Sequence, residues 1–395
     1  MSIFLMVVGL VLFVGLVVVH EWGHFIMARR NGVEVEEFGI FFPPRLYKRK
    51  TKAGWQFSVG LLPLGGFVKL KGEHDTDTAK GSFGASSISA KSKIMAAGVV
   101  MNLLTAYVLL VVLALIGMPH IVDNQFTIAS DTHYVKRATY DVRADQVEKQ
   151  SPAAQAGIKT DDTLLAIGKA GQMKAIVRAD RLPELTRQYA GQTVQLSYKH
   201  GETSLEKSIT LRSTAEIDAA RKAGHNEGYL GLSVYETQNG LTVARSTWSA
   251  PVVAGGVIGQ FTALTFQGLG KAVVGLAGTI AGAVTGNTTA RQTAQTEASS
   301  QVSGPVGIFF VFKYGAQLGY TFILMIVAII SLTLAIMNIL PIPALDGGRL
   351  WITLITRAFK RPLSPEREEK INAAGFVFLM ALIVLITFVD VKRFF

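Results

Sequence analysis

Four long apolar segments alternate with polar ones along the chain. Each is long and apolar enough to span a bilayer as a helix, which takes about 20 residues: 3–27, 94–117, 318–340 and 373–389. A basic segment with strand-like stretches fills 29–93, and a polar, globular stretch fills about 119–245. Residues 251–285 are rich in Gly and Ala, and 286–302 are polar and loop-like. The pattern predicts a polytopic α-helical membrane protein with four transmembrane helices and an inserted polar domain.

Composition supports a membrane protein. The 395 residues are 49% hydrophobic and only 17% charged, and the mean hydropathy is +0.35. The net charge of +11 comes from basic residues that cluster beside apolar spans, so membrane topology explains it more simply than nucleic-acid binding does. The chain contains no cysteine, which excludes disulfides and thiolate metal sites.

The distribution of Lys and Arg predicts the orientation. Segment 29–93 holds twelve, and the loop after the third span holds six. Both segments should be cytoplasmic, which places both termini and the polar domain outside. An even number of crossings must then separate the two basic segments, so 251–285 should not be a single extra span. It lies on the surface, re-enters, or forms a hairpin.

A metal-binding pattern ends the first apolar segment. Residues 20–24 read His-Glu-Trp-Gly-His. On a helix, positions i and i+4 share a face, so His20 and His24 can bind one zinc ion. Glu21 lies beside them and is placed to activate a water molecule. The segment has neither the basic start nor the cleavage site of a signal peptide. Polar groups inside an apolar span indicate a functional site.

Catalytic zinc normally has three protein ligands, and the third must come from elsewhere in the chain. The other histidines lie in polar segments or at a span end, and Asp346 and Asp390 are the acidic residues near spans. Asp346 follows the third span on the cytoplasmic side, after two helix-breaking prolines and before Gly347 and Gly348, which permit a tight turn. Asp390 falls on the opposite side of the membrane. We therefore expect Asp346 to be the third ligand.

The polar domain has the pattern of a known module. Residues 147–168 read VEKQSPAAQAGIKTDDTLLAIG, which predicts a strand, a short helix ending near Gly157, a turn and a β-rich run. This resembles a PDZ domain of bacterial envelope proteases, although Asp161 stands where a glycine usually does. The stretches VQLSYKH and LEKSITLR fit further strands, and GYLGLSVYE predicts another.

Together these features resemble the site-2 protease family, and within it the bacterial RseP type. The resemblance rests on HEWGH in the first span, on the Asn-x-x-Pro-x-Pro-x-Leu-Asp-Gly run from Asn338 to Gly347, and on a PDZ insert between the second and third spans. Residues 60–68 are similar to the family's membrane-re-entrant β-hairpin, 303–308 to a segment before the third span, and Asn102 to a recurring asparagine. The RseP type carries two tandem PDZ domains, whereas this chain has one.

The resemblance implies a site and a mode of substrate binding. His20, His24 and Asp346 would bind one Zn²⁺, and Glu21 would be the general base. A re-entrant hairpin within 57–70 would hold an unwound substrate by β-addition. The residues expected to contact substrate are Asn338, Gly65, Gly66, Phe67, Pro341, Pro343 and Asn102.

The resemblance also implies partners and a location. The substrate would be a single-span membrane protein, such as a membrane-anchored anti-sigma factor, already trimmed by an upstream site-1 protease; remnant signal peptides are another possibility. The enzyme would be a multi-pass protein of the bacterial inner membrane, with its active site near the cytoplasmic side. The expected parts are 1–118 with the first two spans, 119–245 with the PDZ domain, the membrane-associated 246–317, and 318–395 with the last two spans.

Two other functions are compatible with parts of this pattern. The chain could be a membrane-anchored zinc protease of aqueous substrates, although its motif lies in an apolar span rather than in the polar domain. It could also be a PDZ-bearing scaffold or a transporter with an inert motif. Zinc content separates this last reading from the two protease readings.

Overall fold

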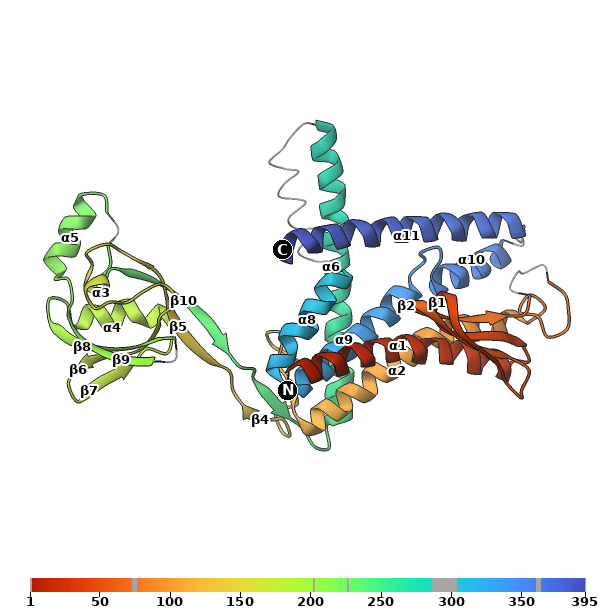
Figure 1. The fold of residues 1–395 in the computed structure, drawn as a ribbon, viewed down its shortest axis with the longest axis horizontal. Helices are drawn as coiled ribbons and strands as arrows, with labels where there is room; N and C mark the ends of the chain where they lie inside the picture. Colours follow the sequence, from red (N-terminus) through yellow and green to blue (C-terminus); the bar gives the residue numbers. More distant parts are fainter. Residues whose placement is uncertain are drawn as a thin grey trace. The chain divides into compact units, whose positions relative to one another are not determined.

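The structure is a computed structural model that describes residues 2–72, 77–201, 203–225, 227–285, 304–359 and 364–394. The chain forms two compact units, one of residues 1–135 and 243–395 and the other of residues 136–242. The first unit contains the long helices and a curled β-sheet, and the second is a small β-rich domain (Figure 1). The predicted loop 286–302 lies outside the described residues.

Each of the four predicted spans corresponds to a helix: α1 (Ser2–Arg30), α2 (Ile88–Ile116), α9 (Tyr320–Ile339) and α11 (Pro365–Phe394). Two shorter helices, α8 (Pro305–Leu318) and α10 (Asp346–Ala358), flank α9 in sequence. The side chain of Ser87 caps the start of α2 by accepting a hydrogen bond from the backbone N–H of Ala90. Gly117, with φ of 138°, ends that helix.

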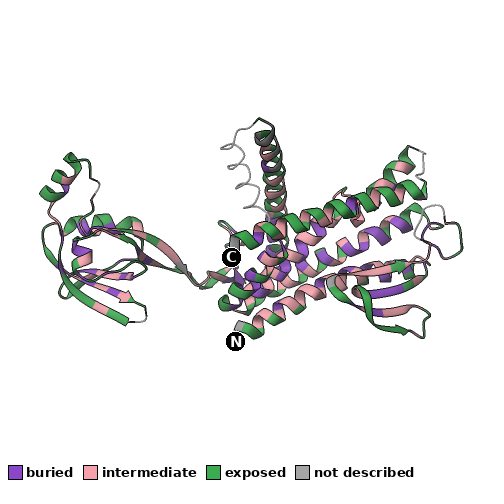
Figure 2. Ribbon diagram, turned by 45° about the horizontal axis from the view of Figure 1, so that its top comes forward, coloured by how far each residue is buried: buried purple, intermediate pink, exposed green. Residues whose placement is uncertain are grey.

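Helix packing places α2 and α9 at the centre of the first unit. Leu113 of α2 and Met325 of α9 are fully buried. They belong to a core that also includes Val257, in the helix Ala250–Thr285 that lies between α2 and α9 in sequence. A second core joins α1 to α8 and α9 around Phe312. By contrast, large apolar side chains such as Val11 and Phe378 are exposed on α1 and α11, and Figure 2 shows such exposure along the outer helix faces. Apolar surface of this extent is typical of contact with lipid.

The Gly/Ala-rich segment forms one continuous helix, α6 (Ala250–Thr285). The predicted hairpin alternative is therefore wrong. Five helices of the described chain are long and apolar enough to cross a membrane: Ile3–Arg30, Ile88–Ile116, Ala250–Thr279, Tyr320–Ile339 and Glu366–Lys392. In both views α6 runs across the direction shared by α1, α2, α9 and α11 (Figures 1 and 2). The number of crossings, predicted as four, thus stays a prediction.

The basic segment after α1 folds into a curled sheet of β1 (Val35–Lys50) and β2 (Gln56–Leu70). Residues 37–40 of β1 pair with 56–59 of β2 in one register and with 66–69 in another, so they lie between the two halves of β2. The second half of β1, residues 45–50, pairs with 56–60. Among the described residues, 66–70 thus form one edge of this curled sheet. The hairpin predicted within 57–70 is therefore wrong as to its pairing: in the described residues the two halves of β2 pair with β1, which lies between them.

The second unit confirms the predicted strands of the polar domain. Its sheet has the order β10-β5-β6-β8-β9, with β7 also pairing with β6. The strands are β5 (Thr139–Val147), β6 (Thr163–Lys169), β7 (Gln172–Ala175), β8 (Thr193–His200), β9 (Thr203–Thr210) and β10 (Leu232–Asn239). The helical elements are α3 (Pro152–Gln155), η1 (Ala179–Arg181), α4 (Leu182–Gln188) and α5 (Thr214–Lys222). The assignment as a PDZ domain stays a prediction.

Asp161 stands at a turn of the second unit where the predicted module usually has glycine. Its φ is +70°, in the left-handed region where glycine is the common choice. Aspartate tolerates this region better than most other residues do. Its side chain also accepts a hydrogen bond from the Tyr235 hydroxyl. The turn is therefore retained although the glycine is absent.

A small sheet and an aspartate define the start of α6. The sheet has the order β3-β11-β4, from β3 (Met118–Pro119), β11 (Val243–Arg245) and β4 (His133–Lys136). Asp131 accepts hydrogen bonds from the backbone and side chains of Thr247 and Ser249, just before α6 begins. Burial would raise the pKa of Asp131, but these hydrogen bonds outweigh it and hold the pKa well below its usual range.

Candidate metal centre

The last third of α1 carries the first two candidate ligands. His20 and His24 lie four residues apart, so both side chains leave the same face of the helix. Their Nε2 atoms are 3.2 Å apart, and their rings meet edge to face with centroids 4.9 Å apart. His20 is buried, with an exposed fraction of 9%. The pairing predicted from the sequence spacing is thus formed.

The third candidate ligand arrives from the far end of the chain. After α9 ends at Ile339, the loop turns through Ala344, with φ of +73°, and Asp346 is the first residue of α10. A Cβ on Gly347 would lie 2.4 Å from the carbonyl oxygen of Leu340, and one on Gly348 would lie 2.1 Å from that of Ile342. The two glycines therefore serve close backbone approach, while Ala344 supplies the positive φ that the sequence assigned to them.

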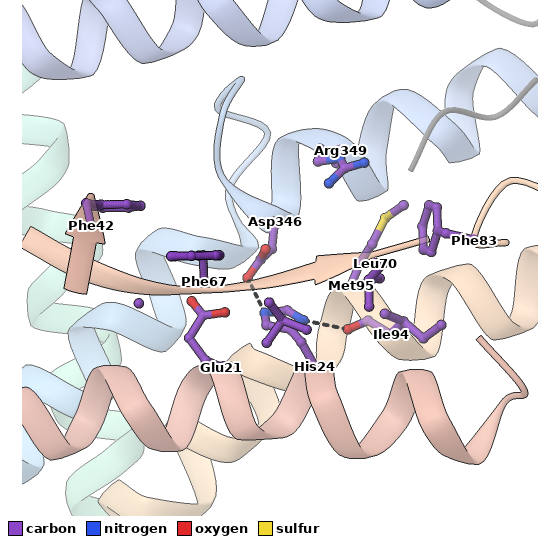
Figure 3. Close-up of a pocket in the computed structure, with 12 residues that line it drawn as sticks. Glu21, His24, Phe42, Phe67, Leu70, Phe83, Ile94, Met95, Asp346 and Arg349 are labelled. Carbon is purple, nitrogen blue, oxygen red and sulfur yellow. Dashed lines mark hydrogen bonds and ion pairs between the residues drawn. The ribbon is translucent and has the colours of Figure 1, made fainter. Parts of the chain in front are cut away.

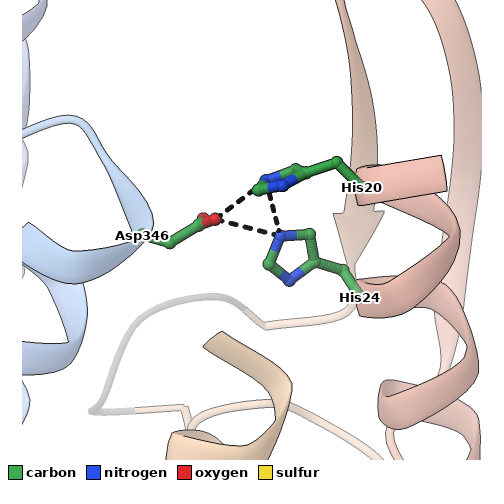
Figure 4. A group of neighbouring side chains, drawn as sticks. All are labelled: His20, His24 and Asp346. Atoms are coloured by element: carbon green, nitrogen blue, oxygen red, sulfur yellow. Dashed lines mark hydrogen bonds and ion pairs between the residues drawn. The ribbon is translucent and has the colours of Figure 1, made fainter. Parts of the chain in front are cut away.

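His20, His24 and Asp346 converge (Figure 4). Oδ2 of Asp346 lies 2.9 Å from Nε2 of His20 and 3.1 Å from Nε2 of His24. A tetrahedral zinc ion with bonds of about 2.0–2.1 Å holds its ligand atoms about 3.3 Å apart. The three separations are close to this value, and two imidazole nitrogens with one carboxylate oxygen are a ligand set that catalytic zinc uses. The residues therefore fit a zinc ion.

Hydrogen bonds behind the ligands orient them. Nδ1–H of His24 donates to the carbonyl oxygen of Ile94 in α2, at 2.8 Å. This bond places the proton on Nδ1 and leaves the Nε2 lone pair free to bind a metal. Nδ1 of His20 lies 3.3 Å from the side-chain amide of Asn102, also in α2. Helix α2 thus supports both imidazoles.

Glu21 faces a pocket of about 230 Å³ beside the three ligands (Figure 3). The backbone N–H of Val68 in β2 donates to its carboxylate. A Cβ on Gly66 would lie 3.0 Å from Cγ of Glu21. Edge segment 66–70 therefore runs directly past Glu21. The pocket is lined by Glu21, His24, Phe42, Gly66, Phe67, Val68, Leu70, Phe83, Ile94, Met95, Asp346 and Arg349.

The residues expected to contact substrate divide into three groups. Gly66 and Phe67 line the pocket, and a Cβ on neighbouring Gly65 would lie 3.1 Å from the ring of Phe42. Asn102 is 1% exposed and contacts His20 instead of lining the pocket. The third group precedes Asp346 and is not part of the lining: Asn338, Pro341 and Pro343. Pro343 packs against Gly375 of α11.

Several residues of the site were not predicted from the sequence. A Cβ on Gly98 would lie 2.4 Å from Nε2 of His24 and 2.5 Å from Cε1 of His20, so only glycine leaves room for the ligands. Gly98 precedes Asn102 by four residues, so the two share a helix face. This spacing was the one signal in the sequence that linked Gly98 to the site. Phe83 and Arg349 line the end of the pocket opposite Phe42 and Phe67 (Figure 3). No pattern in the sequence links Phe83 to Arg349.

An ion pair fixes the sheet beside the pocket. Arg45 donates two hydrogen bonds to the buried Glu37, and Ser58 donates a third. The hydrogen bonds from Arg45 are the main cause that lowers the pKa of Glu37, and they outweigh the opposing effect of burial. Glu37 therefore remains ionised and joins both halves of β1 to β2.

Comparison with known proteins agrees with this geometry. The model of a family described as peptidase family M50 matches residues 8–382. Protease RseP of Yersinia pestis is 26% identical, with 96% of each chain covered. The zinc metalloprotease RasP of Shouchella clausii is 23% identical, covering 96% of this chain and 97% of its own. A Clostridium perfringens protein with the provisional name zinc metalloprotease is 28% identical over 97% of each chain. The chain belongs to peptidase family M50, the zinc metalloproteases of the site-2 type.

Proposed function

We propose that this membrane metalloprotease hydrolyses peptide bonds within or near the transmembrane segments of single-span membrane proteins. One observation carries the proposal: Glu21 and the three candidate ligands lie beside an open sheet edge, and two of those ligands belong to an apolar helix. A protease of aqueous substrates has no need of a site among such helices. Ionisable groups in a span are costly unless they serve a function.

The catalytic roles follow from the arrangement. His20, His24 and Asp346 would hold one zinc ion, which when bound would supply a Lewis acid for the scissile carbonyl and for the attacking water. Glu21 accepts the proton of the attacking water and passes it to the leaving amine. The hydrogen bond from Val68 orients the Glu21 carboxylate toward the pocket. Asp346 is the first residue of α10, so its contacts with His20 and His24 also hold the start of α10 next to α1.

The edge segment 66–70 receives the substrate backbone. A substrate helix must unwind before hydrolysis, and its exposed N–H and C=O groups then need partners. Among the described residues, 66–68 pair with β1 on one side, and in this proposal an extended strand adds on their other side. Gly66 allows that strand to approach Glu21 closely. Asn338, Pro341 and Pro343 contact the remaining part of the substrate in this proposal.

The charge distribution supports a location for the site. Both basic segments lie on the cytoplasmic side, with the termini and the β-rich second unit outside. This arrangement requires α6 to lie along the membrane surface, which its direction across the other helices supports (Figure 1). The second unit, as a PDZ domain, then binds trimmed termini or excludes substrates with large external domains. An upstream site-1 protease supplies the trimmed substrate.

Co-expression with tagged single-span proteins tests this function. We expect the wild type to shorten at least one such substrate, and Glu21→Gln to leave it intact. Glu184→Gln is a matched control, because it makes the same change in an exposed ion pair of the second unit. Cleavage that persists with Glu21→Gln contradicts the mechanism. If the purified wild type instead cleaves casein while every membrane substrate stays whole, the protein acts on aqueous substrates.

A further inference from the structure

Asn102 is a predicted substrate contact that lies behind a candidate metal ligand and does not line the pocket. It lies on α2 with an exposed fraction of 1%, behind the ring of His20. Its amide Nδ2 is 3.3 Å from Nδ1 of His20, and its Oδ1 is buried without a hydrogen-bond partner among the described residues. A buried amide with an unmet hydrogen bond destabilises the folded protein, so its position calls for an explanation.

The tautomer of His20 supplies the explanation. Nε2 of His20 points at Asp346 and is the atom available to a metal. A neutral imidazole with its lone pair on Nε2 carries its proton on Nδ1, which is then a donor and needs an acceptor. The acceptor within reach is the Asn102 side chain. The choice of O and N in an amide rests on its partners, so a half-turn of the amide puts Oδ1 toward Nδ1–H of His20.

The two histidines are then supported in the same way. His24 donates Nδ1–H to the Ile94 carbonyl, and with the amide turned by a half-turn His20 donates Nδ1–H to Oδ1 of Asn102. Ile94, Gly98 and Asn102 follow one another at intervals of four on α2, so they share one helix face. The backbone carbonyl of Asn102 also accepts a hydrogen bond from the buried Ser331 of α9, at 2.7 Å. This bond joins the backbone of α2 at Asn102 to α9.

We propose that Asn102 is a positioning residue of the zinc centre, which holds His20 in the tautomer and ring orientation that bind zinc through Nε2. The inference rests on the proposed zinc site, which it deepens, and it replaces the expected substrate contact of Asn102. Partners of this kind contribute about 10- to 100-fold to metal affinity. The contribution belongs to the acceptor oxygen, not to the volume of the side chain.

Zinc affinity of the full-length protein in detergent tests the proposal, measured by competition with a chelator. Asn102→Leu keeps the volume and removes the acceptor, so it should weaken zinc binding about 10- to 100-fold. Asn102→Asp keeps an acceptor and should stay within about threefold of wild type. Thr105→Val is the matched control, because that hydroxyl bonds only within α2, to Met101. Cobalt substitution gives a second readout, since the absorption spectrum reports the ligand geometry.

Each outcome either supports or overturns the positioning role of Asn102. Weak binding by Asn102→Leu, with restored binding and spectrum in Asn102→Asp, supports the proposal. Equal affinities and spectra for wild type and Asn102→Leu overturn it, as does equal weakening by both Asn102 variants. If Asn102→Leu does not fold, Asn102→Ala removes the acceptor in its place: weakened zinc binding supports the proposal, and binding equal to wild type overturns it. A wild type that binds no zinc contradicts the proposed function itself, and His20→Ala provides the baseline for that result.

Discussion

Two aspartates lie among apolar helices of this protein, and their surroundings are opposite. Asp346 contacts two imidazole nitrogens, and its side chain is 27% exposed toward a pocket. Asp390 of α11 is 1% exposed and accepts hydrogen bonds from the backbone N–H groups of Gly304 and Gly307, at 2.9 and 2.7 Å. Those groups belong to the start of α8, which needs an acceptor and favours a negative charge.

The comparison separates a functional carboxylate from a structural one. A carboxylate whose partners are backbone N–H groups completes a helix end, and no further ligand is needed. A carboxylate that lies beside two imidazole nitrogens and a pocket can still bind a metal ion. Sequence alone placed both aspartates near spans, and only topology favoured Asp346. The following variants test whether the two roles are as distinct as their contacts.

The largest effect is expected from Asp346→Asn. The substitution removes one of three ligands, so zinc affinity and proteolysis should fall by at least about 100-fold. Asp390→Asn, by comparison, should leave zinc content unchanged. Metal analysis of the purified proteins and a cleavage assay measure both. Equal loss of zinc in the two variants would remove the distinction.

Gly98→Ala should have the next largest effect. Its Cβ would overlap both imidazoles, so either the ligands or α2 must shift, and zinc affinity should fall by roughly 10-fold or more. Gly15→Ala in α1 is the control, since a Cβ there has nothing within 4 Å. That variant should gain helix stability of up to about 1 kcal/mol. Chelator competition and thermal unfolding check both results, and unchanged zinc affinity in Gly98→Ala would contradict the close packing.

Asp390→Leu should destabilise the protein without touching the metal centre. It leaves two buried N–H groups of α8 without their acceptor, at a cost of about 1–3 kcal/mol each. The unfolding temperature in detergent should fall, while zinc stoichiometry should remain that of the wild type. A drop in zinc content at intact fold would instead link α8 to the site.

The smallest effect concerns Asp131, an aspartate that caps α6 outside the apolar segments. Its pKa is lowered in the folded protein, so its stabilising contribution is present above the unfolded pKa of about 3.9. The contribution is lost as pH falls through the lower folded value. Wild type should therefore lose stability below about pH 4, and Asp131→Asn should lose less over that window. Thermal unfolding between pH 7 and 3 measures the difference, and identical profiles would show that the cap does not titrate.

Sequence reasoning reached the parts of this molecule that depend on local spacing. The interval of four residues brought His20 and His24 together, and apolar length located α1, α2, α9 and α11. Alternating stretches located the strands of the second unit. Asp346 followed from topology, because the positive-inside distribution put both span ends on one side of the membrane.

The remaining features depend on contacts between distant segments. The two registers of 37–40 require β2 to fold back around β1, which no local pattern encodes. The support of His24 by the Ile94 carbonyl uses a backbone group, which any residue would supply. The contact of Asn102 with His20 was not predicted, because the face of α2 that meets α1 is known only once the two helices are packed together. Helix α6 was misread as a segment that could bend into a hairpin, because Gly and Ala composition does not fix a turn.

In the proposed mechanism, the sheet edge beside Glu21 makes the site a filter on the substrate's own stability. Strand addition at the edge requires a segment whose backbone N–H and C=O groups are free. An intact helix has already paired these groups within itself. The rate at which a membrane protein is cut then depends on how readily its segment melts near the scissile bond. Glycine or proline at that point would mark a substrate before any side chain is read.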